Sequence, residues 1–230
     1  MNDELRDRFP NNSSQLNKLP VDSGETVIYA YLHKQFVYGV PFDRGEIYFD
    51  HKRVAGFGAA DVRQRGNVRI LHYENDNRFL LRVVVESPID ELFLAKGFSM
   101  DDPSEALAEV RYHAKAWGDP MNEDDQFAAP VLNLDFERDY LNGDPLNFTA
   151  GGQPWMLEFM KERVRFKMDE KGVKLENEAI LRDPKGGIKM KPKPKILHLD
   201  KPYWVVMKLK KSDRPYFLLG VRNTAMMTRK

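Results

Sequence analysis

The residues that could carry out metal or proton chemistry are few and dispersed. The five histidines are His33, His51, His72, His113 and His198. No two of them have the spacing that metal ligands take along a helix or across a hairpin. We therefore interpret each histidine as a structural or surface residue. The sequence predicts no metal site and no cofactor.

Patterns for nucleophilic and nucleotide chemistry are equally weak. The chain has no cysteine, which excludes disulfides, iron–sulfur clusters, thiolate zinc sites and cysteine nucleophiles. No Gly-x-Ser-x-Gly motif occurs, and Gly56-Phe-Gly58 lacks the third glycine of a dinucleotide-binding fingerprint. A Ser/His/Asp triad assembled in space stays open as an alternative, because triads are not local in sequence. We predict that the chain is not an enzyme.

Two acidic clusters have simpler explanations than paired acid–base catalysis. Asp101 and Asp102 precede Pro103 and an apolar periodicity, which is the pattern of a capped helix start. Residues 123–125 are typical of a solvated loop. Residues 139–144 lack the ligand spacing and closing glutamate of an EF-hand.

Residues 182–195 form a basic segment rich in lysine, proline and glycine. Its cations are Arg182, Lys185, Lys189, Lys191, Lys193 and Lys195. It could be a flexible arm for an acidic partner, but we favour a solvated crossover that its prolines keep extended. The formal net charge of the whole chain is only +1, and no run of 18 apolar residues occurs. We therefore predict neither a nucleic-acid partner nor a membrane partner.

Strand signals dominate the elements that would have to position any site. Aromatic, β-branched and alternating patterns predict strands over residues 26–33, 36–38, 47–49, 54–57, 68–73, 78–85, 131–136, 160–168, 203–209 and 215–221. The strand over 78–85 is nearly continuously apolar, so we expect it to be buried on both faces. Alternation resumes over 173–179, which predicts a further strand paired with 159–168.

One helix is predicted after Asp101. Ala106, Leu107, Val110, Ala114 and Trp117 recur at helical spacing, and Gly118 and Pro120 end the pattern. Residues 1–24 have almost no apolar periodicity and are interpreted as a flexible or loosely packed arm. Residues 25–230 are then interpreted as a single domain.

The order of these elements resembles the C-terminal portion of a serpin. The strongest motifs are Asp200-Lys-Pro-Tyr203 before an apolar strand and Phe217-Leu-Leu-Gly220, which ends near an asparagine. Residues 161–172 are similar to the strand and Glu-x-Gly hinge that lead into the reactive-centre loop. Residues 26–42 resemble the aromatic-rich central strand of that family, and 131–140 resemble its strand leading to a tyrosine, although Asn133 and Asp135 depart from the usual residues.

The resemblance implies an α+β, strand-dominated fold with serpin-like antiparallel sheets or a barrel and one or a few helices. The hinge-like residues it implies are Glu170, Gly172, Val173, Leu175 and Asn177. The basic segment then corresponds to the reactive loop. Inhibitory serpins carry small residues after the hinge glycine, whereas this chain has bulky and charged ones. The N-terminal half of the family fold has no counterpart in the 230 residues.

These observations predict a non-inhibitory, serpin-like binding or scaffold protein in which 173–181 is a fixed sheet strand. A protease inhibitor that presents 182–195 in substrate-like fashion and an enzyme with an unrecognised site stay open as alternatives. The missing half would leave the strand at 26–38 or 159–168 with an open edge, so we expect a homo-oligomer or a protein partner rather than a target protease. The polar, acidic start lacks a signal peptide, which favours the cytoplasm unless a leader was trimmed.

Overall fold

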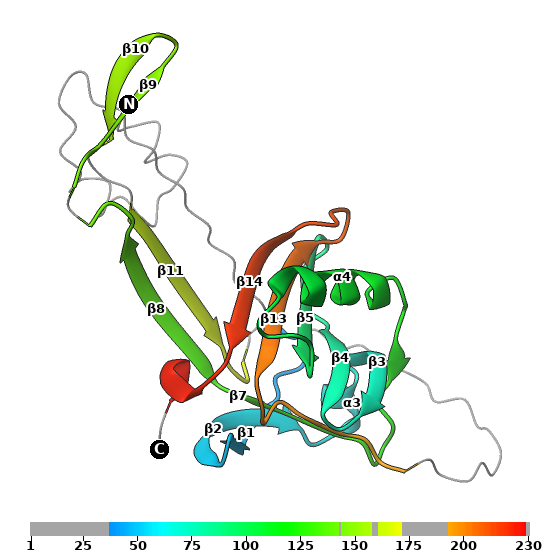
Figure 1. Ribbon diagram of the computed structural model, residues 1–230. Coiled ribbons are helices and arrows are strands. Elements are labelled where there is room, and N and C mark those ends of the chain that lie inside the picture. Colours follow the sequence, from blue (N-terminus) through cyan, green and yellow to red (C-terminus); the bar gives the residue numbers. More distant parts are fainter. Residues whose placement is uncertain (1–36, 143, 158–160, 172–192, 229–230) are drawn as a thin grey trace. The chain divides into compact units, whose positions relative to one another are not determined.

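The computed structural model describes residues 37–142, 144–157, 161–171 and 193–228 (Figure 1). Over these residues the fold is α+β and strand-dominated, with several antiparallel sheets and two α-helices, as the sequence predicts. The arm at 1–24, the strand at 26–33 and the strand at 173–181 lie outside the described residues. No helix in the described part is long and apolar enough to cross a membrane.

The chain divides into two compact units. One contains the described residues of 37–135 and 165–228, and the other contains those of 136–164. The division falls within β8 (Leu132–Asp139) and β11 (Lys161–Met168), which together form a two-stranded sheet. The larger unit holds the sheets that bury most of the apolar side chains, and the smaller unit holds a separate hairpin.

The larger unit is built on a six-stranded antiparallel sheet. Its order is β14 (Pro215–Val221), β13 (Tyr203–Leu209), β5 (Asp90–Lys96), β4 (Arg78–Val83), β3 (Val68–Asn75) and β6 (Asp119–Pro120). In β4, Phe79, Leu80 and Leu81 are fully buried, which confirms that this strand is covered on both faces. Leu80 and Leu81 belong to different apolar clusters because successive side chains of a strand point to opposite faces.

A four-stranded sheet shares the main apolar core with the six-stranded sheet. Its order is β1 (Asp43–Phe49), β2 (Lys52–Ala59), β7 (Gln126–Pro130) and β12 (Ile196–His198). β1 and β2 are joined by Asp50 and His51, both with positive φ, as a two-residue hairpin turn requires. β12 pairs parallel to β7, while the other pairs are antiparallel.

Helix α4 (Pro103–His113) covers one face of the six-stranded sheet (Figure 1). The Asp102 side chain accepts hydrogen bonds from the backbone N–H groups of Ser104 and Glu105 at 2.9 and 3.0 Å, which confirms the predicted cap. The helix nevertheless ends four residues before Trp117, and the Trp117 side chain is 92% exposed rather than part of the apolar stripe. The Arg82 guanidinium donates to the Ala114 carbonyl at 2.9 Å, so a carbonyl left without a donor at the helix end has a side-chain partner.

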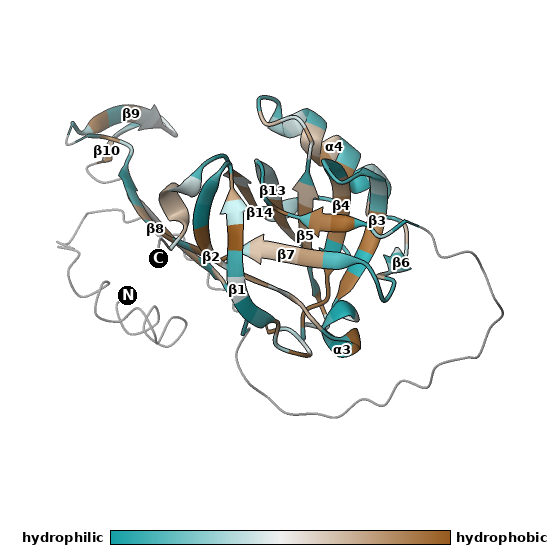
Figure 2. Cartoon of the chain, turned by 90° about the horizontal axis from the view of Figure 1, so that it is seen from below, coloured by the Kyte–Doolittle hydropathy of each residue, from teal (hydrophilic) through white to brown (hydrophobic). Residues whose placement is uncertain are grey.

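Several elements were not predicted from the sequence. They are α3 (Val62–Arg65), β5, β6, β7, β9 (Leu146–Ala150), β10 (Gln153–Leu157), β12 and the short 3-10 helix η2 (Thr224–Met226). β5 is the most consequential omission because it lies between β13 and β4 in the larger sheet. Figure 2 shows apolar segments along the strands of this sheet, whereas α4 alternates between hydrophilic and hydrophobic residues.

Candidate functional site at the two flanks of segment 172–192

Glu170 fixes the chain just before segment 172–192. It is the only hinge-like residue within the described part, since Gly172, Val173, Leu175 and Asn177 lie outside it. The Glu170 side chain is buried and accepts a hydrogen bond from Arg44 Nε in β1. Its backbone carbonyl accepts from the N–H of Phe42 at 2.9 Å. The first flank is therefore bound to the start of β1 through both its side chain and its backbone.

Asp169 holds a bend at the point where β11 ends. Its carboxylate accepts a hydrogen bond from the backbone N–H of Lys171 at 2.9 Å and forms an ion pair with Lys167 Nζ at 2.7 Å. Burial alone would raise the pKa of the Asp169 carboxyl, but these two hydrogen bonds and the charges of Lys167 and Arg44 outweigh it and lower that pKa. Because the bond to Lys171 spans two residues, it bends the backbone locally at Glu170.

Lys195 fixes the second flank. Its backbone N–H donates to Asp125 Oδ1 at 2.8 Å, and its carbonyl accepts from the N–H of Gln126 at 3.0 Å. Its ammonium lies 5.5 Å from the centre of the Tyr73 ring. Of the other basic-segment residues, Lys193 is described and exposed, whereas Arg182, Lys185, Lys189 and Lys191 lie outside the described residues.

Asp125 corrects the prediction of a solvated acidic loop. Its carboxylate is buried and receives the backbone N–H of Asn122 at 2.8 Å as well as that of Lys195. A buried carboxylate is stabilised when backbone donors take the place of water, which explains its position. Sequence alone could not separate Asp125 from Glu123 and Asp124, because the donor from Lys195 is 70 residues away.

Lys96, at the end of β5, binds residues that end and follow β12. Its side chain is 2% exposed, and Nζ donates to the carbonyls of Asp76 and His198, both at 2.8 Å. It also forms an ion pair with the Asp200 carboxylate. Three oxygen partners satisfy the three donors of a buried ammonium. Lys96 was not singled out from the sequence. The only sequence feature that could have indicated it is a lysine at the end of an apolar run, directly before Gly97.

Tyr73 and Asp76 complete the second flank. The Tyr73 hydroxyl donates to Asp76 Oδ1 at 2.6 Å, and the backbone N–H of Ile196 donates to the same oxygen at 3.1 Å. The hydrogen bond from Tyr73 and then that from Ile196 lower the pKa of Asp76. Burial and the hydrogen bond to Asp76 raise the pKa of Tyr73 to about 12. Both flanks of segment 172–192 are thus attached to the larger unit by charge-assisted hydrogen bonds.

His72 and His113 correct the expectation that the histidines are dispersed. Their rings, from β3 and α4, stack with centroids 4.0 Å apart. Burial and the neighbouring His72 lower the pKa of His113, which favours the neutral ring. Within the described ranges, however, no three His, Asp or Glu side chains are grouped as a metal site would need. The pair is separated by 41 positions, so only the tertiary fold brings it together.

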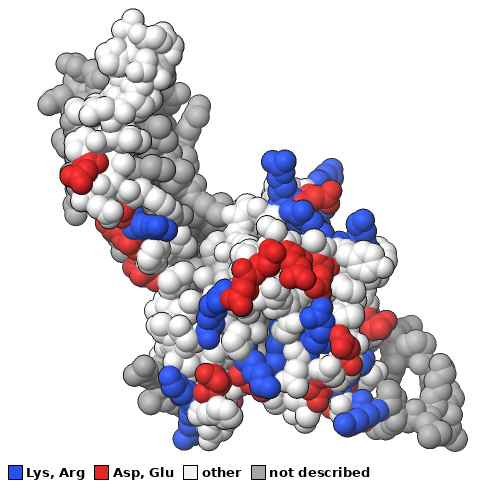
Figure 3. All heavy atoms as spheres, in the orientation of Figure 1, with Lys and Arg blue, Asp and Glu red and all other residues white. Residues whose placement is uncertain are grey.

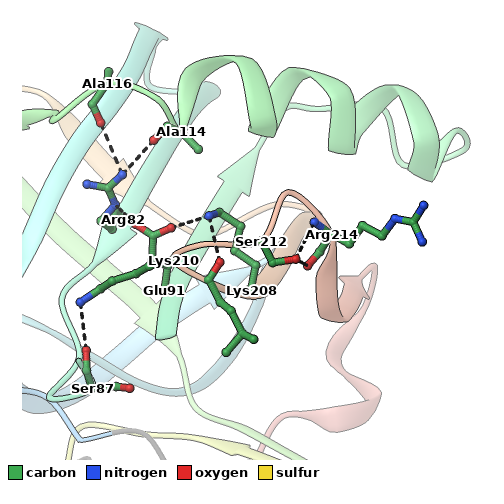
Figure 4. A network of polar contacts seen from close by, with 10 residues as sticks. Arg82, Ser87, Glu91, Ala114, Ala116, Lys208, Lys210, Ser212 and Arg214 are labelled. Atoms are coloured by element: carbon green, nitrogen blue, oxygen red, sulfur yellow. Dashed lines mark hydrogen bonds and ion pairs between the residues drawn. The ribbon is translucent and has the colours of Figure 1, made fainter. Parts of the chain in front are cut away.

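A second polar cluster ties three strands to the end of α4 (Figure 4). The Glu91 carboxylate lies 2.6 Å from Lys208 Nζ and 3.4 Å from Arg82 Nε. Arg82 also donates to the carbonyls of Ala114 and Ala116. Glu91, Lys208 and Arg82 therefore each face an opposite charge or a carbonyl. We interpret the cluster as a structural link between β4, β5, β13 and α4.

Comparison with known proteins gives a match in structure but not in sequence. No family model and no curated protein matches the chain. Protease nexin-1, solved with heparin, superposes with a TM-score of 0.52 at 10% identity, covering 81% of this chain and 54% of that one. Serpin-12 of Manduca sexta gives 0.51 at 9% identity, covering 82% and 53%. Serpin48 of Tenebrio molitor gives 0.46 at 12% identity, covering 81% and 52%.

The chain has a serpin-like fold. The two superpositions with TM-scores above 0.5 support this, and at 9–10% identity they bear on the fold alone. They confirm the predicted resemblance in its architecture. The serpin-like chain spans about half the length of the serpins that it matches.

Proposed function

We propose that this serpin-like chain is a non-inhibitory binding or scaffold protein without catalysis, in which residues 173–181 form a fixed strand beside β11. The observation that carries the proposal is the bend after β11. Asp169 holds that bend through Lys171, and Glu170 binds Arg44 and the backbone of Phe42. A bend directly after a strand supports the return of the chain along that strand.

A strand that is permanently paired cannot insert into a sheet later, so the chain stores no free energy for such a conformational change. The inhibitory mechanism implied by the resemblance needs a loop that is free of the sheet until it is cut. The alternation of Val173, Leu175 and Asn177 with charged residues instead suits a strand with one covered face. If that strand is already paired, cleavage beyond it releases little free energy.

The binding role rests on the open edge of a small sheet. Among the described residues, β8 and β11 pair only with each other. An edge strand offers unpaired backbone groups to another chain. In the proposal residues 173–181 pair with the outer edge of β11, and the outer edge of β8 is left for a protein partner. A target protease is not required for either arrangement.

Cleavage within the basic segment tests the absence of a conformational trap. Limited trypsin digestion at Arg182 or Lys185 should change the melting temperature by no more than about 2–4 °C, which corresponds to about 1 kcal/mol in a domain of roughly 150–250 residues. Mock-digested protein is the matched control. A rise of tens of degrees after the cut would show that the loop had entered a sheet and would overturn the proposal.

A protease panel separates the proposal from substrate-like inhibition. We expect no stoichiometric inhibition of trypsin-like enzymes by the intact chain. Stoichiometric inhibition that disappears in the R182A/K185A variant would instead support presentation of residues 182–195. The R111A/K115A variant removes one arginine and one lysine that are exposed outside that segment, and it is the control for loss of positive charge.

A further inference from the structure

The β9–β10 hairpin contains no charged residue. Residues 145–157 have no Asp, Glu, Lys or Arg, although charged residues make up 31% of the whole chain. Figure 3 shows the hairpin, labelled in Figure 1, without acidic or basic atoms on the visible face. Leu146, Phe148, Trp155 and Met156 are each between 43% and 55% exposed. A small sheet that exposes this much apolar surface is marginal in water by itself.

The hairpin turn determines which backbone groups point outward. Gly151 and Gly152 have φ values of +60° and +77° and form a two-residue turn flanked by the pair Ala150–Gln153. Pairs in an antiparallel ladder alternate between exchanging hydrogen bonds and not exchanging them. Counting from the turn, Asn147 and Thr149 belong to the pairs that do not exchange. Their N–H and C=O groups therefore face away from β10.

The two outer edges of the hairpin differ. On β10 the outward positions are Pro154 and Met156, and proline has no N–H to donate. On β9 the outward positions, Asn147 and Thr149, retain both donors. Among the described residues β9 pairs only with β10. Charged residues and prolines are the usual protection of sheet edges, and the outer edge of β9 has neither.

We propose that two copies of this chain form a two-fold dimer by antiparallel pairing of β9 with β9. Asn147 of each copy then lies opposite Thr149 of the second copy, and these pairs exchange four backbone hydrogen bonds. Phe148 meets Phe148 of the second copy on the two-fold axis, where side chains approach most closely. The result is a four-stranded sheet without like charges opposite each other. This inference does not depend on the proposed function.

A second copy suits this edge better than a bilayer or a charged partner. In a bilayer the unpaired backbone groups of an open edge lose their hydrogen bonds to water without replacement. A charged partner would find no complementary charge in residues 145–157. A second copy supplies the missing backbone partners and places the same uncharged, largely apolar side chains beside those of the first copy. Because only one strand of each copy takes part in the pairing, we expect weak association that depends on concentration.

Cysteine cross-linking tests the axis, because the chain itself has no cysteine. We expect F148C to form an intermolecular disulfide under mild oxidation, since directly opposed non-hydrogen-bonded positions lie within disulfide range. N147C mixed with T149C should cross-link more than either variant alone. M156C is the matched control, because Met156 is 55% exposed and Phe148 44%, and it lies on the protected edge. Equal cross-linking of F148C and M156C would contradict the two-fold pairing.

Charge variants test the same edge without cross-linking. N147K/T149K places lysines opposite each other across the axis, so its dissociation constant by sedimentation should rise at least about tenfold. Mixing it with N147E/T149E should restore association as a mixed dimer, whereas M156K alone should leave association unchanged. A monomer at every concentration, with no cross-link, would mean that another segment such as 1–24 covers the edge, and the proposal would be wrong.

Discussion

The six-stranded sheet and the β9–β10 hairpin are both antiparallel, yet they are stabilised very differently. In the larger sheet the strands β4, β5 and β13 each have two neighbours, and their side chains are buried on both faces. In the hairpin each strand has one described neighbour, and most large side chains are about half exposed. Backbone pairing is therefore common to both, and the difference lies in how much apolar surface each removes from water.

This difference indicates which interactions stabilise the folded structure of each region. The larger sheet is ordered by its own core and by charged residues that are paired within it. The hairpin has a well-defined turn but few buried contacts, so its order should depend on what it pairs with. The following predictions test this contrast, from the largest expected effect to the smallest.

Truncating one phenylalanine in each region should give the largest contrast. Phe93 in β5 is fully buried, so F93A should lower the free energy of unfolding by about 3–5 kcal/mol. Phe148 in β9 is 44% exposed, so F148A should lower it by less than about 1 kcal/mol. Urea denaturation followed by tryptophan fluorescence measures both. Equal losses would remove the distinction between the two regions.

Removing the buried ammonium of Lys96 should give the next largest effect. K96M leaves the carbonyls of Asp76 and His198 without their donor, and we expect a loss of about 2–3 kcal/mol. D200N is the matched variant, because its amide oxygen can still accept from Lys96 Nζ while the buried ammonium loses its counter-charge; it should cost about 1–3 kcal/mol. A neutral K96M would show that the second flank is held by apolar packing alone.

The larger sheet was predictable wherever a long apolar run met a clear turn. The strands at 68–73, 78–85, 203–209 and 215–221 follow this rule, and each lies within or overlaps an observed strand. β5 was not predicted because the charged residues at its ends, Asp90, Glu91 and Lys96, interrupt the apolar pattern of the strand. Those charges are satisfied by residues distant in sequence, such as Lys208 and Asp200. No local pattern could reveal those partners.

The β9–β10 hairpin and the contacts at the two flanks of segment 172–192 were not predicted, for other reasons. Gly151-Gly152 is a recognisable turn signal, but Pro154 and the polar Asn147 weaken the strand pattern on either side of it. Glu170 was singled out from the resemblance, whereas its partner Arg44 lies 126 positions away. Helical spacing placed Trp117 on α4 because periodicity carries no information about where a helix loses its hydrogen bonds. Most hinge-like residues lie outside the described part, so that prediction stands untested.

Two tyrosine hydroxyls test whether every buried polar group of the larger sheet has a hydrogen-bond partner. The Tyr203 hydroxyl in β13 is buried and has no hydrogen-bond partner among the described residues. The Tyr216 hydroxyl in β14 donates to Asp90 Oδ1 at 2.9 Å. We expect Y203F to raise the free energy of unfolding by about 1 kcal/mol and Y216F to lower it by a similar amount. Thermal denaturation of both variants measures the signs, and a destabilised Y203F would reveal a missed partner.

The smallest effect should be a pH dependence confined to the larger unit. Burial lowers the pKa of His198 and of His113 below the ordinary value of 6.5 in the folded chain. For His198, Lys96 adds to this lowering, while Asp200 and Asp76 oppose it. Below about pH 6.5 the unfolded chain therefore binds more protons than the folded chain. Stability should be fully present above that pH and should fall as the pH decreases.

Replacing His113 and His198 removes the difference in proton binding between the folded and unfolded chain, and so tests whether these two rings cause the pH dependence. The melting temperature of the H113Q/H198Q variant should depend less on pH between 7.5 and 5.5 than that of the parent chain. Residues 145–157 contain no titratable side chain, so the dissociation constant of the β9 dimer should change less than about twofold over the same range. A dimer that weakened in step with the melting temperature would tie the hairpin to the larger core and contradict the contrast between the two regions.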